Sequence, residues 1–189
     1  MEQQRCAWAN RSRLLAAYHD EEWGRPHHDD RILFEQMVLV TFQAGLSWEL
    51  ILKKRPAMRR VFAGFDPSAI SRFNEAYIEQ LLDNPDIIRN GAKIRAMVNN
   101  ARCFEILQQE FGSFDTYLWQ FAPPLPEGLA RHPSLALTKS PESELLAENL
   151  RQRGFKFVGP TTCHSYMQSV GMFGNPHAPD CFLGHVPTL

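Results

Sequence analysis

Residues 154–162 read GFKFVGPTT, and an apolar helical pattern lies on each side of this segment. The helix before it has a strong start, because Ser140 offers an N-cap hydroxyl and Pro141 fits a first helical turn. Glu142 complements the positive end of the helix dipole. A second helix is predicted after the segment, ending near Gly171. The pattern therefore predicts two helices joined by a short hairpin of glycine and apolar residues.

The hairpin has features of a phosphate-binding turn. Gly159 permits close approach of the backbone to a phosphate, and the first amides of the next helix lack intrahelical partners and point at such an anion. Arg153 and Lys156 place positive charge beside it. The alternative is an ordinary helical turn whose glycines are C-caps, which is common in helical proteins. A second candidate for a DNA-facing turn is 87–93, IIRNGAK, which combines an Asn-Gly signal with flanking cations; the alternative is a surface loop.

The rest of the chain is also helical in pattern. From Gly91 to Phe111 the apolar residues recur at spacings of three and four. Asp29 or Asp30 is placed to cap an apolar helix, and a helix after Leu46 is expected to stop before Pro56, because the residue preceding proline disfavours the α region. Short helices are expected at 67–73, 75–82 and 113–121. Period-two alternation never runs far enough to indicate a sheet, so the predicted fold class is all-α.

The chain of 189 residues is expected to form a single domain. Its predicted parts are a central helical body at about 29–121, a proline-rich connection at about 122–140, a helix–hairpin–helix at about 141–172, and two ends, 1–20 and 173–189. No internal repeat or low-complexity tract interrupts this arrangement.

Composition limits the class of protein. Hydrophobic residues make up 44%, and 13 Phe and 4 Trp are enough to fill a core. No stretch approaches the roughly 20 apolar residues of a membrane span, and the N-terminus has no apolar signal core, so a cytoplasmic protein without membrane contact is expected. The net charge of −1 means that any DNA binding needs a local basic face. Cations do cluster, in 53–60, 89–95 and 151–156.

Two segments are rich in aromatic and polar residues: 18–24, YHDEEWG, and 43–48, QAGLSW. Together with Trp8 they offer stacking walls and a few hydrogen-bonding groups, which a pocket for a flipped base requires. A positively charged alkylated base would also gain from cation–π attraction. The alternative is that Trp8, Trp23 and Trp48 are core residues whose indole N–H groups are satisfied.

Each end of the chain carries one cysteine and one histidine suited to metal binding. His177 and Cys181 lie near the C-terminus, and Cys6 and His19 near the N-terminus. Two Cys and two His form a favoured tetrahedral zinc site, which would join the two ends and add metal-binding energy to folding. Free thiols are the alternative, and the rival ligands are Cys163, His164 and His185.

Several motifs, in order and at matching spacing, resemble the 3-methyladenine DNA glycosylase I family. They are residues 5–8 (RCAW), 18–24 (YHDEEWG), 42–48 (FQAGLSW), 153–161 (RGFKFVGPT), 165–168 (SYMQ) and 177–181 (HAPDC). The resemblance covers nearly the whole chain, and so many specific motifs in this order are very rare by chance.

The resemblance implies a monomeric helix–hairpin–helix enzyme that hydrolyses the N-glycosidic bond of alkylated adenine in double-stranded DNA, without a lyase step. It implies structural Zn²⁺ held by Cys6, His19, His177 and Cys181. The implied DNA-binding hairpin is Lys156, Phe157, Val158, Gly159, Pro160 and Thr161. The implied base pocket contains Trp8, Tyr18, Glu22, Trp23, Val40, Gln43 and Trp48. The family lacks the aspartate used by related glycosylases; Asp180 is a weak candidate for it, because its neighbour Cys181 is expected to bind metal.

One position departs from the family. Its pocket glutamate, three residues before Gln43, is Val40 here, so no catalytic residue is assigned. Loss of a good hydrogen bond to a base costs about 1–3 kcal/mol. Three outcomes remain open: weak activity through stacking, another preferred lesion, or DNA binding without cleavage. Glu22, Glu35 or Glu49 replaces the glutamate only if the fold aims it at the pocket, and the latter two are expected to face solvent. A structural zinc protein without DNA contact is a further alternative.

Overall fold

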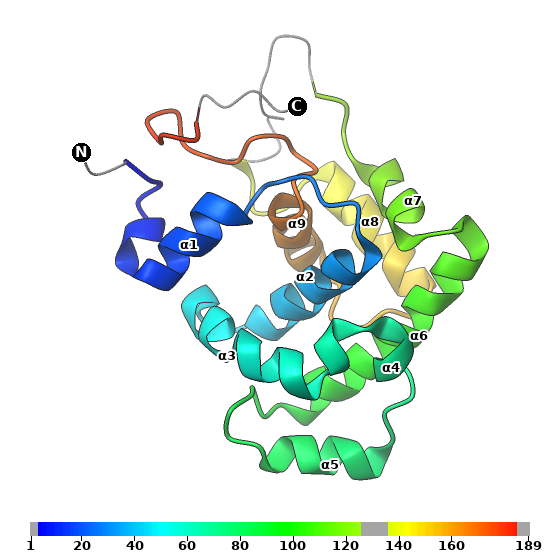
Figure 1. The fold of residues 1–189 in the computed structure, drawn as a ribbon. Coiled ribbons are helices and arrows are strands. Elements are labelled where there is room, and N and C mark those ends of the chain that lie inside the picture. Colours follow the sequence, from blue (N-terminus) through cyan, green and yellow to red (C-terminus); the bar gives the residue numbers. More distant parts are fainter. Residues whose placement is uncertain (1–3, 126–135, 185–189) are drawn as a thin grey trace.

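The computed structural model describes residues 4–125 and 136–184, which form helices and turns without a strand. The predicted all-α class is confirmed (Figure 1). The α-helices are α1 Arg13–Glu21, α2 Asp30–Gln43, α3 Trp48–Val61, α4 Pro67–Ile70, α5 Glu75–Asp83, α6 Gly91–Phe111, α7 Phe114–Leu118, α8 Pro141–Gln152 and α9 Pro160–Ser169. Short 3-10 helices occupy Ala9–Arg11, Ala63–Phe65 and Trp119–Phe121.

Helix α2 is the centre of the molecule. It contacts α3, α6, α7 and α9, and the side chains of Phe34, Leu39 and Phe42 have no exposed surface. Asp29 is its N-cap and accepts hydrogen bonds from two backbone amides of the first turn. Asp30 instead accepts from the Phe114 and Asp115 amides, which joins the start of α2 to α7. Because residues 33–42 are all buried, α2 is a firmly held helix whose C-terminal end can position residues of a site.

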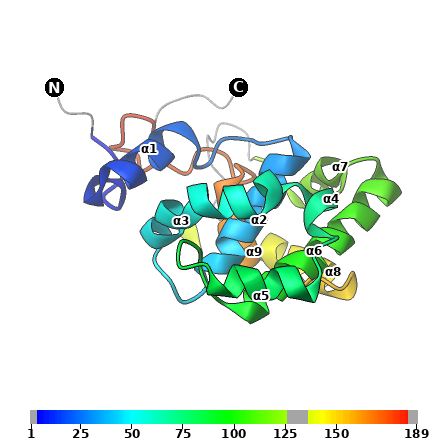
Figure 2. The same cartoon turned by 60° about the horizontal axis from the view of Figure 1, so that its bottom comes forward.

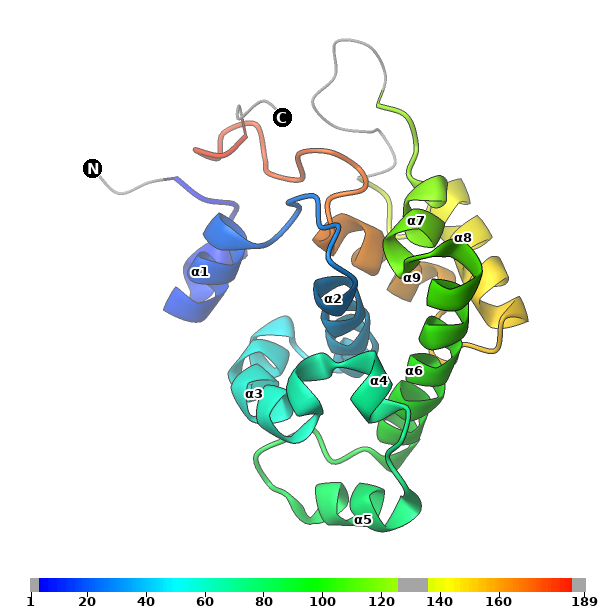
Figure 3. The same cartoon turned by 45° about the vertical axis from the view of Figure 1, so that its right-hand side comes forward.

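The remaining helices surround α2. Figure 2 shows α3 along one side of it, with α5 and α6 toward the viewer. Figure 3 shows α7 and α8 beside the long helix α6, and α4 also packs on α6. Within the described residues, no helix is long and apolar enough to cross a lipid bilayer.

The expected end of a helix before Pro56 is wrong, because α3 continues through this residue to Val61. Ile51 and Met58, one heptad apart on either side of the proline, have no exposed surface. Burial of this apolar face, at roughly 1.5–3 kcal/mol for a fully buried side chain, outweighs the single backbone hydrogen bond that proline removes.

The predicted helix pair at the C-terminal side is present as α8 and α9, which pack against each other. Ser140 and Ser143 form a capping box at the start of α8. Gly154 follows α8 with φ +89°, a left-handed conformation that favours glycine. Of the proline-rich connection, residues 126–135 lie outside the described part of the chain.

The two ends of the described chain meet. The Phe182 amide donates to the Gln4 carbonyl at 2.8 Å, and the Gln4 side chain donates to Asp180 at the same distance. In Figure 1 the dark blue N-terminal segment and the red C-terminal segment lie on one side of the molecule, next to α1. This arrangement brings their cysteines and histidines to one place.

Candidate base pocket and metal centre

A cavity of about 320 Å³ lies between α1, α2, α3 and α9. Four aromatic rings form much of its wall. The rings of Trp8 and Trp23 meet edge to face at 5.0 Å, and those of Tyr18 and Trp48 lie 5.2 Å apart. The lining residues are Trp8, Arg11, Leu15, Tyr18, Trp23, Val40, Gln43, Ser47, Trp48, Glu49, Ser165, Gln168 and Ser169.

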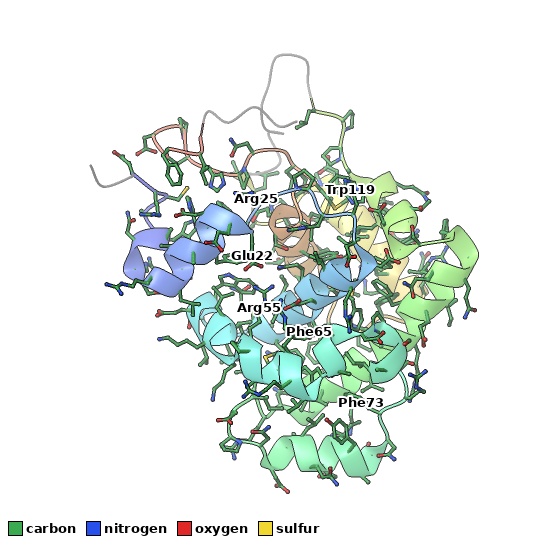
Figure 4. The ribbon with its side chains drawn as sticks, viewed as in Figure 1. Glu22, Arg25, Arg55, Phe65, Phe73 and Trp119 are labelled. Carbon is green, nitrogen blue, oxygen red and sulfur yellow. The ribbon has the colours of Figure 1, made fainter. Side chains whose placement is uncertain are left out.

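The structure therefore brings together most of the predicted pocket residues: Trp8, Tyr18, Trp23, Val40, Gln43 and Trp48. Glu22 does not line this cavity. It lies at the end of α1 and faces Arg55 of α3 (Figure 4). The Arg55 guanidinium lies 2.7 Å from the Glu22 carboxylate. The resemblance implied a place for Glu22 in the pocket, but at the end of α1 its side chain points toward α3.

Glu35 is buried rather than solvent-facing, so that expectation is wrong. Its carboxylate lies 2.7 Å from Arg55 and 2.8 Å from Arg59. Burial of a carboxylate is tolerated here because two guanidinium groups of the next helix satisfy it. Neither Glu22 nor Glu35 is thus available to a ligand in the aromatic cavity.

Sequence reasoning assigned no pocket role to five lining residues: Arg11, Leu15, Ser165, Gln168 and Ser169. Glu49 was expected to face solvent, but it lines the cavity and is only partly exposed. Helical spacing could have indicated some of the five as pocket residues. Leu15 precedes Tyr18 by three positions, and Gln168 and Ser169 follow Ser165 by three and four, so each set shares one face of its helix.

The aromatic side chains differ from ordinary core residues. Trp8, Trp23 and Trp48 remain partly exposed, and the buried indole N–H of Trp48 has no hydrogen-bond partner within the described residues. Burial and the nearby Glu22 raise the pKa of Tyr18, so its hydroxyl keeps its proton at neutral pH. Val40, only 5% exposed, contributes an apolar patch to the wall. The cavity is therefore apolar and aromatic with a few polar groups.

Lys93 holds the turn that leads from Gln43 to Trp48. Its ammonium, on α6, donates to the carbonyls of Phe42 and Ala44 at 2.8 and 2.6 Å. These carbonyls belong to the end of α2, where a cation also complements the helix dipole. The side chain is 5% exposed, so Lys93 does not supply a cation to the candidate DNA-facing turn at 87–93. The Asn-Gly signal in this segment is the N-cap of α6, supplied by Asn90.

The predicted metal ligands converge. The side-chain donor atoms of Cys6, His19, His177 and Cys181 all lie within 4.8 Å of one another, and all four residues are buried. His19 Nε2 lies 3.1 Å from His177 Nδ1 and 3.5 Å from Cys181 Sγ. Such spacings approach the edges of a tetrahedron around a zinc ion, whose ligand bonds measure about 2.0–2.3 Å.

The surroundings of this cluster also suit a metal. The other ring nitrogen of His19 lies 2.8 Å from Asp20, and Arg5 holds that carboxylate in turn at 2.8 Å. A carboxylate behind a ligating imidazole fixes its tautomer and orientation. Of the rival ligands, Cys163 and His164 lie on α9 outside the cluster, and His185 lies outside the described residues. Asp180 accepts a bond from Gln4 and does not line the cavity.

The hairpin before α9 is held from α6. The Asn100 side chain accepts from the Lys156 amide and donates to its carbonyl, at 2.8 and 3.0 Å. Phe157 has φ +58° and is 44% exposed, so a large apolar ring projects from the turn. Gly159 is the N-cap of α9 without a side-chain cap, and a Cβ added there would meet no atom within 4 Å. The start of α9 is thus open to a ligand.

Many of the clustered cations form ion pairs within the protein, so these side chains do not contribute to a free basic face. Arg55 and Arg59 pair with Glu35, and Arg153 pairs with Glu110 at 2.6 Å. Arg95 pairs with Glu75 and Glu79. The exposed cations of these clusters that form no ion pair among the described residues are Arg60, Arg89, Arg151 and Lys156.

Known proteins resemble this chain along nearly its full length. Residues 8–184 match the sequence profile of the methyladenine glycosylase family. DNA-3-methyladenine glycosylase 1 of Escherichia coli (strain K12) is 40% identical over 179 residues, which cover 94% of this chain and 95% of that protein. DNA-3-methyladenine glycosylase of Haemophilus influenzae is 37% identical over 179 residues, 94% of this chain and 96% of that protein.

Solved structures agree. A crystal structure of 3-methyladenine DNA glycosylase I superposes with a TM-score of 0.86 at 44% identity, covering 95% of this chain and 98% of that one. A variant of 3-methyladenine DNA glycosylase I in complex with 3-methyladenine superposes with a TM-score of 0.87 at 32% identity, covering 97% of this chain and 98% of that one.

Proposed function

The chain belongs to the methyladenine glycosylase family, and we propose that it hydrolyses the N-glycosidic bond of 3-methyladenine in DNA. The observation that carries this proposal is the cavity of about 320 Å³ walled by Trp8, Tyr18, Trp23 and Trp48. Its aromatic walls suit a flat purine taken out of the base stack. The matching relatives are named for this activity, and one solved structure has 3-methyladenine bound.

Cleavage of this glycosidic bond needs little chemical assistance from the protein. Adenine methylated at N3 carries positive charge while it is bound to the sugar, so it leaves as a neutral base when the bond from C1′ to nitrogen breaks. The bond's electron pair goes to the base, water adds to C1′, and the water gives up a proton. Stacking and cation–π attraction hold the base in a geometry from which this step proceeds. We assign no side chain as the general base.

The hairpin of Lys156, Phe157, Val158, Gly159, Pro160 and Thr161 supplies the DNA contact in this proposal. Its support is the open start of α9, the exposed ring of Phe157 and the unpaired charge of Lys156. The same helix α9 contributes Ser165 and Gln168 to the cavity, so one element joins the phosphate-binding turn to the base pocket. The partner is double-stranded DNA with an alkylated base.

Zinc is the metal that best suits Cys6, His19, His177 and Cys181. Two thiolates and two imidazoles form a closed structural set, which leaves no open position for substrate. The proposed role is therefore to join the chain ends, and the reaction itself uses no metal.

A base-release assay that includes a substitution of Val40 tests the proposed activity. Release of free 3-methyladenine from methylated duplex DNA is measured for the chain and for Val40→Glu. We expect release by the unmodified chain, with Val40→Glu changing the rate by about 5- to 150-fold, because one base contact is worth about 1–3 kcal/mol. Release only by Val40→Glu would instead support a module that binds damaged DNA without cleaving it, which the family relationship does not favour.

The hairpin is tested separately. Lys156→Ala should weaken binding to undamaged duplex DNA and reduce the salt dependence of that binding. If no salt-dependent binding to DNA is found, the result would support the alternative of a structural zinc protein without DNA contact.

A further inference from the structure

Two charged side chains line the aromatic cavity, the cation Arg11 and the carboxylate Glu49. Of the described residues that line it, Glu49 alone carries a carboxylate. Glu22 and Glu35 are held by Arg55, and Asp20 is held by Arg5. Of the acidic side chains near the site, Glu49 is thus the one placed to meet a ligand in the cavity.

Glu49 is positioned together with the stacking ring. It follows Trp48 directly in the first turn of α3, so the start of this helix delivers both an aromatic face and a carboxylate. Ser47 caps the helix by accepting from the Leu50 amide, and this bond fixes the first turn. The placement therefore depends on the backbone of α3 and not on a mobile loop.

The carboxylate is charged but lightly bound. The hydrogen bond from Lys53 and, to a smaller extent, one from Ser12 lower the pKa of Glu49, so the group is ionised at neutral pH. Lys53 is one helical turn away at 3.0 Å and its side chain is 61% exposed. Such surface pairs contribute little and exchange readily. By contrast, Glu35 is 5% exposed and bound to two arginines.

The proposed substrate carries a positive charge, which the Glu49 carboxylate can attract. An adenine alkylated at N3 and still bound to its sugar is cationic, whereas the undamaged base has nearly the same shape and no charge. Val40 and Leu15 offer the ring only apolar contact. We propose that Glu49 makes this cavity select a cationic purine over a neutral one. The inference rests on the proposed function.

The test compares two small probes that cannot be hydrolysed. 3,9-Dimethyladeninium is a permanent cation that mimics the alkylated nucleotide, and 9-methyladenine is its neutral counterpart. Isothermal titration calorimetry at neutral pH and low salt gives the dissociation constant of each probe. We expect the unmodified chain to bind the cation more tightly, and Glu49→Gln to lower this preference about tenfold. Affinity for the neutral probe should stay within about twofold, since the carboxylamide keeps the size of the side chain.

Lys53→Met is the matched variant, because it removes the surface partner of Glu49 and leaves the carboxylate in place. It should raise the preference for the cation, and circular dichroism verifies that both variants are folded. An unchanged preference in Glu49→Gln, in a chain that releases 3-methyladenine from methylated DNA, overturns this inference and leaves the proposed function standing. A chain that binds neither probe and releases no base contradicts both.

Discussion

At the residue scale, the side chain with the largest expected effect is Trp48. Its ring closes the cavity against Tyr18, and its buried N–H has no partner within the described part of the chain. A core tryptophan normally satisfies that group, so its packing alone does not explain this residue. We expect the ring face to stack on a ligand, which is the role that the next substitution tests.

Trp48→Ala should lower single-turnover release of 3-methyladenine about 5- to 150-fold, because stacking of a base on an aromatic ring contributes about 1–3 kcal/mol. Affinity for undamaged duplex DNA, measured in parallel, should not change. Equal losses in both measurements would instead indicate general misfolding, and an unchanged rate of release would contradict the stacking role.

His164 predicts how stability depends on pH. It is 2% exposed, and burial lowers its pKa below the ordinary value. Below a pH of about 6.5 the unfolded chain gains a proton that the folded chain does not, until the lowered pKa is reached. The free energy of unfolding should therefore fall in acid, by up to about 1.4 kcal/mol per pH unit from this group.

Urea unfolding at several pH values between neutrality and mild acid measures this slope. His164→Gln, which keeps a polar side chain beside Gln168, should show a shallower slope than the unmodified chain. Identical slopes for the two proteins would show that His164 does not titrate differently in the folded and unfolded states.

At the scale of elements, the site depends on how α6 supports the end of α2. The Lys93 ammonium is the link, because it bonds two carbonyls on either side of Gln43. A buried cation without a carboxylate partner is rare. Here the carbonyl dipoles of a helix terminus take the place of that partner, and the turn to Trp48 is fixed as a result.

Lys93→Met should lower the free energy of unfolding by about 1–3 kcal/mol, because it leaves buried carbonyl oxygen without a donor. It should also slow base release, since Gln43 and Trp48 lose their support. The matched control is Arg102→Met on the same helix, which removes an exposed bond to the Ser71 carbonyl far along α6. We expect a loss below about 0.5 kcal/mol and no change in release for the control. Equal effects of the two substitutions would argue against a positioning role for Lys93.

At the scale of the whole molecule, the chain ends are joined next to the aromatic cavity. Gly24 permits this joining: its φ is +74°, and a Cβ there would lie 2.0 Å from Pro176, immediately before His177. His19 lies in the same helix as Tyr18 and contacts the ring of Trp8 at 5.4 Å. The metal cluster and the aromatic wall therefore share one support.

Metal removal tests this coupling. Elemental analysis should find one zinc ion per chain, and a strong chelator or Cys181→Ala should destabilise the fold by several kcal/mol. Each kcal/mol lowers the melting temperature of a chain of this size by about 2–4 °C. Cys103→Ala, a buried cysteine outside the cluster, should keep the metal. A metal-free chain whose melting temperature does not respond to chelator would exclude the structural zinc.

Much of the fold was determined by local sequence. Capping residues such as Asn90 and Ser140, the apolar period of α6 and the turn at Gly154 act within a few residues of each other, so the helices and the hairpin could be predicted. The Cys/His set and the aromatic wall were indicated by the resemblance of the motifs to a family, because the residue types alone left free thiols and core tryptophans as alternatives.

Tertiary structure decided the electrostatics. Whether Glu35, Lys93 or Arg153 faces solvent depends on which helix packs beside it, and that neighbour is distant in sequence. The same applies to α3 passing through Pro56, to Glu22 turning toward Arg55, and to Glu49 reaching the cavity. Helix formation is local, whereas the burial of a charge depends on partners that only the folded chain brings together.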